Sequence, residues 1–106
     1  MPFIRIWIHI VFSTKNREKL ISGELKPKLI EHIRANAKLK EIRIDSINCV
    51  QDHIHILLSL GKEQSISKTA MLIKGESSFW INKNHLIPGK LNGRMNILRY
   101  QWESPQ

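Results

Sequence analysis

A chain of 106 residues with 42% hydrophobic residues suits one compact domain and is incompatible with global disorder. Its 17 lysines and arginines against 9 acidic residues give a net charge of +8, which points to a polyanionic partner, most economically nucleic acid, with an anionic membrane surface as the competitor. The sequence has no apolar run of membrane-spanning length, no signal-peptide layout and only one cysteine, so we expect a cytoplasmic protein that is not inserted in a membrane.

The first predicted element is a strand over residues 3–13, where apolar and polar side chains alternate. Successive side chains of a strand point to opposite faces, so one face should enter the core: Ile4, Ile6, Ile8, Ile10 and Phe12. The other face is mixed and includes Arg5, Trp7 and His9. Of these, Arg5 is a candidate contact to nucleic acid.

A basic loop over residues 13–17 follows, and its Lys15 and Arg17 are candidate phosphate contacts. A helix is expected over residues 24–39, with Ser22 as a candidate N-cap. Apolar residues recur there at every fourth position, as on the buried face of a helix: Leu25, Leu29, Ile33 and Ala37.

The most specific chemical signal lies in the third predicted strand, which follows a second strand over residues 42–49 and a turn at Asp52. His53 and His55 are two positions apart, so they project side by side from one face of the strand. Two imidazoles in this arrangement could bind one divalent cation. The structural alternative is a pair of half-exposed histidines on a solvated sheet face.

A second helix of about 20 residues is expected from Ser65, with Lys68 and Lys74 among its polar positions. A last strand is expected within residues 95–102. The resulting order, strand–helix–strand–strand–helix–strand, is typical of the α+β class with a ferredoxin-like (split βαβ) fold. Both helices would cover one face of an antiparallel sheet, and the whole chain would form one domain. The open face would then gather the mixed face of the first strand and the two histidines.

Three ordered stretches resemble the single-tyrosine HUH transposases, the small transposases of insertion sequences and their REP-associated relatives. The stretches are RIWIHIVFSTKNR at 5–17, DHIHIL at 52–57, and SISK at 65–68 continuing to KGESSFWIN at 74–82. Together they place the resemblance over residues 1 to about 84.

The resemblance implies a homodimeric DNA transposase that cleaves and rejoins single-stranded DNA beside a hairpin. His53 and His55 match the histidines that hold Mg²⁺ or Mn²⁺ at the scissile phosphate. A tyrosine on a C-terminal helix then attacks that phosphate and forms a 5′-phosphotyrosyl enzyme, which conserves the phosphodiester energy for rejoining. The loop at 13–17 and the helix surface from Lys68 to Lys74 match regions expected near DNA.

The C-terminal part of the chain departs from the family pattern. After Asn82 the family continues with an aromatic-x-Trp-Gln strand segment and later a helix that carries the nucleophilic tyrosine, with a glutamine four residues on. Here Tyr100 belongs to a segment that matches the strand, YQWE at 100–103, and the fourth residue after it is Ser104. Tyr100 is the only tyrosine and hence the only candidate for that role. We expect the chain to lack the tyrosine helix.

Two other functions stay open at this point. A non-catalytic module of the RNA-recognition type could stack bases on Phe3 and Trp7, although the sequence lacks the Lys/Arg-Gly-Phe-Gly-Phe pattern of those domains. An unrelated metal hydrolase could use the three histidines of the open face. It would need acidic ligands, and the nearby candidates are Asp45 and Asp52.

Overall fold

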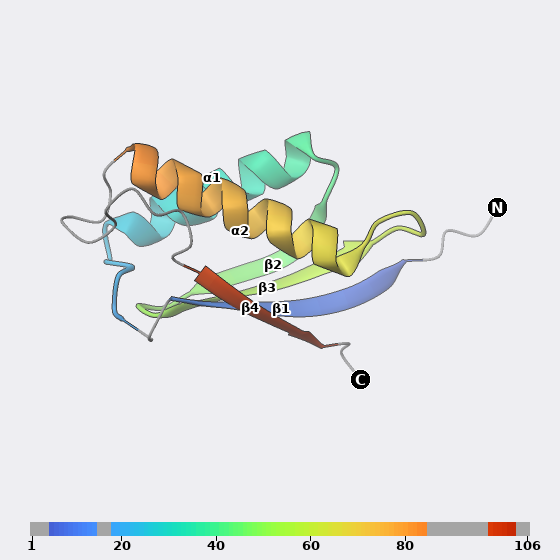
Figure 1. Cartoon of the computed structure of the whole chain (residues 1–106), viewed down its shortest axis with the longest axis horizontal. Helices are drawn as coiled ribbons and strands as arrows, with labels where there is room; N and C mark the ends of the chain where they lie inside the picture. The colour runs from blue at the N-terminus through green and yellow to red at the C-terminus, as the bar shows by residue number, and fades with distance from the viewer. Residues whose placement is uncertain (1–4, 15–17, 85–97, 104–106) are drawn as a thin grey trace.

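The structure, a computed structural model, describes residues 5–14, 18–84 and 98–103 (Figure 1). Its elements follow the predicted order: β1 (Ile6–Thr14), α1 (Leu25–Leu39), β2 (Arg43–Cys49), β3 (His53–Leu60), α2 (Ile66–Lys83) and β4 (Leu98–Glu103). The phosphate-contact candidates Lys15 and Arg17 lie outside the described residues, as do Phe3, Ile4 and the predicted start of the last strand at 95–97.

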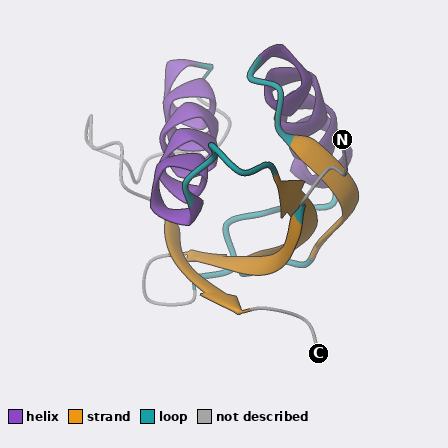
Figure 2. Cartoon of the chain, turned by 90° about the vertical axis from the view of Figure 1, so that its right-hand side faces the viewer, coloured by secondary structure: helices purple, strands orange, loops and turns teal. Residues whose placement is uncertain are grey.

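The four strands form one antiparallel sheet in the order β2-β3-β1-β4. Both helices lie on the same face of this sheet, and no helix of the described residues covers the other face (Figure 2). This arrangement confirms the predicted α+β, ferredoxin-like fold, with β1 and β3 as the central strands. Neither helix is long and apolar enough to cross a membrane in the part of the chain that the structure describes.

The core lies between the sheet and the helices and is built from the predicted apolar faces. The alternating residues of β3 and the every-fourth residues of α1 are buried, as are three side chains of β1: Ile8, Ile10 and Phe12. Ile6 was expected in the same layer but is 50% exposed. Ile6 is the first residue of β1 and lies at the end of the strand, whereas Ile8, Ile10 and Phe12 lie further along it.

Serine side chains accept amide hydrogen bonds at the start of both helices. The hydroxyl oxygen of Ser22 accepts one from the amide of Leu25 at 3.1 Å, but the N-cap position of α1 is Glu24 and not Ser22 as predicted. Ser65, in extended conformation before α2, accepts one from the amide of Lys68 at 3.2 Å. Each bond satisfies one of the amides that a helix start leaves without an intrahelical partner.

A stacked pair of rings joins the two helices. The imidazole of His32 on α1 stacks on the indole of Trp80 on α2, with centroids 4.4 Å apart and planes inclined by 7°. Nε2 of His32 lies 3.7 Å from Oε1 of Glu76, beyond ordinary hydrogen-bond distance. Burial lowers the pKa of His32, and the charge of Glu76 only partly opposes this effect. The helix interface therefore favours the neutral imidazole.

The His32–Trp80 stack predicts that the free energy of unfolding depends on pH. The pKa of His32 is below its ordinary 6.5 in the folded state, so protons bind the unfolded chain more tightly. The contribution of neutral His32 should be complete above pH 6.5 and should be lost as the pH falls towards the folded-state pKa. We expect the free energy of unfolding, measured by urea denaturation between about pH 7 and about pH 5, to fall less steeply in His32→Phe than in the wild type. Equal slopes would contradict this role for His32.

Candidate metal and nucleic-acid site

The two histidines of β3 lie side by side at the start of that central strand, on the open sheet face. β3 pairs with β1 so that His53 lies opposite Ser13 and His55 opposite Val11. The rings of His53 and His55 have centroids 4.7 Å apart and meet at 71°. Between them, Ile54 is 1% exposed and points into the core, so a register slip of one residue would bury both imidazoles and expose the isoleucine. The hydrophobic pattern thus holds both histidines on the open face.

Asp52 orients the first of these rings. Its Oδ1 lies 2.6 Å from Nδ1 of His53, so the carboxylate accepts a hydrogen bond from the protonated Nδ1. This tautomer leaves the lone pair of Nε2 for another partner. Carboxylates hold metal-binding histidines in the same way. The sequence had suggested Asp52 only as an acidic metal ligand, and its position directly before His53 was the signal for this second role.

His9 extends the pair to a row of three imidazoles across β1 and β3. Its Nε2 lies 3.2 Å from Nδ1 of His55, and the two rings stack with centroids 5.3 Å apart. If His55 donates in this bond, its Nε2 is left as an acceptor. Burial, followed by the neighbouring His53 and His9, lowers the pKa of His55. The open face thus gathers the three histidines as predicted.

The donor set fits two protein ligands and not three. Within residues 5–14, 18–84 and 98–103, no group of three or more histidine, cysteine, aspartate or glutamate side chains could hold a metal ion. Asp45, the other acidic candidate, is exposed at the irregularity in the pairing of β2 with β3. The hydrolase hypothesis, which needs a third ligand from these residues, therefore gains no support. A cation at His53 and His55 would take its other ligands from water or a bound phosphate.

The basic residues predicted to contact DNA do not all share this face. Arg5 does: its Nε donates to the hydroxyl of Ser59 and its terminal nitrogen to the Ser59 carbonyl, both at 2.9 Å. Lys68 and Lys74 lie on α2, in the layer on the other side of the sheet (Figure 1). A segment of DNA bound on the histidine face would therefore not contact these two lysines. That Lys68 and Lys74 contact DNA stays a prediction, and it concerns the helix surface.

Tyr100 lies in strand β4, where its backbone is paired with Phe12 of β1. The segment is therefore a strand, as the sequence predicted. A role of Tyr100 as a nucleophile stays a prediction. A small hollow of about 130 Å³ lies at this side of the sheet, lined by His9, Val11, Gln101 and Trp102.

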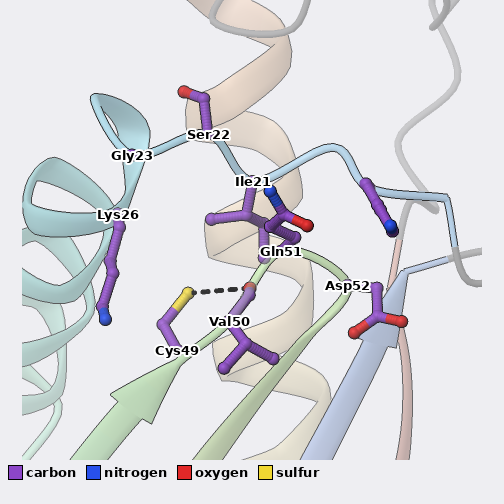
Figure 3. A pocket seen from close by; sticks show the side chains of 9 residues that line it. Ile21, Ser22, Gly23, Lys26, Cys49, Val50, Gln51 and Asp52 are labelled. Atoms are coloured by element: carbon purple, nitrogen blue, oxygen red, sulfur yellow. Dashed lines mark hydrogen bonds between the residues drawn. The ribbon is translucent and has the colours of Figure 1, made fainter.

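A second hollow of about 460 Å³ lies behind Asp52, where the start of α1 faces the β2–β3 turn (Figure 3). Its lining includes Lys26 and the buried Cys49, whose thiol donates to the carbonyl oxygen of Val50 at 3.5 Å. Burial raises the pKa of Cys49, which keeps the thiol protonated. The amide of Ile21 donates to the Gln51 carbonyl at 3.0 Å and fastens the loop before α1 to this turn. The contact holds the turn that presents Asp52.

Comparison with known proteins gives a consistent picture. The family described as "Transposase IS200 like" matches residues 3–96. The transposase for insertion sequence element IS200 of Salmonella typhimurium is 34% identical over 73 residues, which are 69% of this chain and 48% of that protein. The ISDra2 transposase TnpA of Deinococcus radiodurans is 27% identical over 70 residues, 66% of this chain and 50% of that protein. The chain thus spans about half the length of these relatives.

Two solved structures share the fold. A candidate transposase from Deinococcus radiodurans R1 aligns over 97% of this chain and 81% of its own, with a TM-score of 0.80 and 18% identity. A REP-associated tyrosine transposase, solved bound to a REP hairpin, aligns over 100% of this chain and 60% of its own, with a TM-score of 0.64 and 16% identity. Because the family match extends over residues 3–96 of 106, the resemblance noted in the sequence is confirmed: the chain belongs to the family of IS200-like transposases.

Proposed function

We propose that this chain acts in DNA transposition, binds single-stranded DNA next to a hairpin, and holds Mg²⁺ or Mn²⁺ at the scissile phosphate through His53 and His55. The observation that carries the proposal is the pairing of these two imidazoles on the open face, with Asp52 on Nδ1 of His53. A hairpin as the DNA partner is supported by the REP-associated neighbour, which was solved with one. The net charge of +8 favours a phosphate-rich partner.

In this proposal, the neighbours of His53 and His55 orient the two ligand rings. Asp52 fixes the orientation of His53, and the contact with His9 does the same for His55. In this proposal the Nε2 atoms of both rings are left for the cation, on the sheet face where a strand of DNA can pass without entering the protein. A divalent cation bound there would polarise the phosphate and stabilise the charge that develops on it.

The nucleophile of strand transfer is a separate part of the site from the two histidines. Strand transfer of the family type requires a tyrosine hydroxyl to attack phosphorus, displace the 3′-oxygen of the preceding nucleotide and form a 5′-phosphotyrosyl bond. Tyr100, the only tyrosine of the sequence, lies on β4 and not on a helix. We therefore assign DNA and metal binding to the described residues. Strand transfer by Tyr100 and homodimer formation are left to direct tests.

A denaturing gel separates these functions. A labelled single-stranded hairpin DNA with an unpaired flank is incubated with the protein and Mn²⁺, and the same mixture is analysed for binding under native conditions. We expect binding that Mn²⁺ strengthens. A covalent band that disappears in Tyr100→Phe would identify Tyr100 as the nucleophile, and binding without such a band would limit the chain to DNA and metal binding. If the hairpin DNA does not bind at all, the proposed function is wrong.

One observation favours a second candidate, a metal-independent module for single-stranded nucleic acid with an open sheet of the RNA-recognition type. Trp7 lies on the open face of a central strand and is 46% exposed, as an aromatic that stacks on bases would be. A preference for single-stranded RNA over DNA, unchanged by a chelator, would favour this candidate over the transposase.

A further inference from the structure

A tryptophan and two arginines occupy the end of the open face away from the His53–His55 pair. The sheet places Trp7 of β1, Ser59 of β3 and Arg43 of β2 in one cross-strand row. Paired residues of neighbouring strands point to the same face, so Trp7 and Arg43 flank the fully buried Ser59. Arg5, which directly precedes β1, is held at Ser59 by two hydrogen bonds. We call this group the Trp7–arginine cluster.

The exposure of Trp7 and the fixed position of Arg5 are not explained by packing of the core. Trp7 is 46% exposed, although the same strand buries Ile8, Ile10 and Phe12 completely. Because β4 pairs with β1 only from His9 to Thr14, no described strand lies beside Trp7 on that side. One side of the indole is therefore accessible at the end of the sheet. Ser59 takes two of the five N–H donors of Arg5, which fixes the guanidinium and its charge at the residue that pairs with Trp7.

We propose that the Trp7–arginine cluster binds an unpaired nucleotide of single-stranded DNA, with the base stacked on Trp7 and the adjacent phosphates near Arg5 and Arg43. An exposed indole, the fixed guanidinium of Arg5 and the exposed Arg43 in the same row match the two parts of a nucleotide, a flat base and an anionic backbone. A duplex would not fit, because its bases are already stacked inside the helix and cannot reach the indole. The occupant is therefore a single strand.

The position of the cluster relates it to the candidate metal site. Trp7 and Val11 share one face of β1, and Val11 lies opposite His55. Four residues of strand separate them by about 13 Å. A strand that lies along β1 would thus place a base on Trp7 a few nucleotides from the phosphate at the His53–His55 pair. This inference rests on the proposed function. It adds that a base bound on Trp7 determines which phosphate of the single strand lies at the His53–His55 pair.

A double-mutant cycle tests the stacking. Fluorescence anisotropy gives the Kd of a labelled hairpin DNA with a single-stranded flank, and a series of otherwise identical oligonucleotides carries one abasic site at each flank position. We expect Trp7→Ala to weaken binding by about 5- to 150-fold, the range for loss of one base–aromatic stack. In the wild type, one abasic position should cause a similar loss, and that position should have no further effect in Trp7→Ala. Trp7→Phe should retain most of the affinity.

Phe79→Ala is the matched control, because Phe79 is an aromatic of similar exposure, 44%, on α2 in the opposite layer. It should bind DNA as the wild type does. Thermal melting of each variant checks the fold, and sedimentation checks self-association.

Each outcome is informative. Wild-type affinity in Trp7→Ala would overturn the inference, and Mn²⁺-strengthened DNA binding in that variant would leave the proposed function intact. An equal loss for intact and all abasic oligonucleotides would also overturn it, since Trp7 would then not stack on one base. Loss of self-association in Trp7→Ala would assign the cluster to a contact between copies instead. If the wild type binds no single-stranded DNA, the inference and the proposed function both fail.

Discussion

His53→Ala and His55→Ala should each weaken Mn²⁺ binding by on the order of 100-fold or more. The proposed site holds the cation through these two imidazoles, so loss of either leaves it with a single ligand of the pair. Titration calorimetry, or the paramagnetic resonance signal of free Mn²⁺, measures the change. If both variants bind Mn²⁺ as the wild type does, the candidate metal site is wrong.

Two further variants serve as comparisons for the Mn²⁺ affinities of His53→Ala and His55→Ala. Asp52→Asn keeps both ligands but changes the group that accepts the hydrogen bond from Nδ1 of His53, so an intermediate loss of about 10- to 100-fold is expected. His32→Phe removes a histidine from the helix layer, where its ring stacks on Trp80, and should leave Mn²⁺ affinity unchanged. An equal loss in all variants would indicate damage to the fold.

Ile54→Ala should lower the free energy of unfolding by about 2–5 kcal/mol. Ile54 is 1% exposed, and its side chain enters the core between the two histidines that face the opposite way. Its truncation leaves a cavity directly beneath the site. A loss of this size is a large part of the roughly 5–15 kcal/mol by which a typical domain is stable, so the variant should unfold much more readily than the wild type.

Ile6→Ala is the matched control for this prediction. It makes the same chemical change on the neighbouring central strand, but Ile6 is 50% exposed. We expect a loss below about 1 kcal/mol. Urea denaturation measures both variants, and equal losses would show that Ile54 does not have the packing role that its burial indicates.

Much of the fold could be predicted because the relevant signals are local. Alternation in β1 and β3 and the every-fourth spacing in α1 each describe one element and the side that it buries. The error at Ile6 has a different origin. Its burial depends on what packs over the first residue of β1, and the alternation within residues 6–14 does not contain that information.

The candidate site also has features that local sequence patterns predict and features that depend on tertiary contacts. The sequence by itself determined that His53 and His55 share one face, because parity along a strand is a property of the backbone. Only the tertiary structure decided what meets them. His9 reaches His55 across 46 positions, and Arg5 reaches Ser59 across 54, because the register of β1 against β3 is set by the whole buried face of both strands. Lys68 and Lys74 lie in the helix layer and not on the histidine face, which the predicted placement of both helices on one side of the sheet already implied.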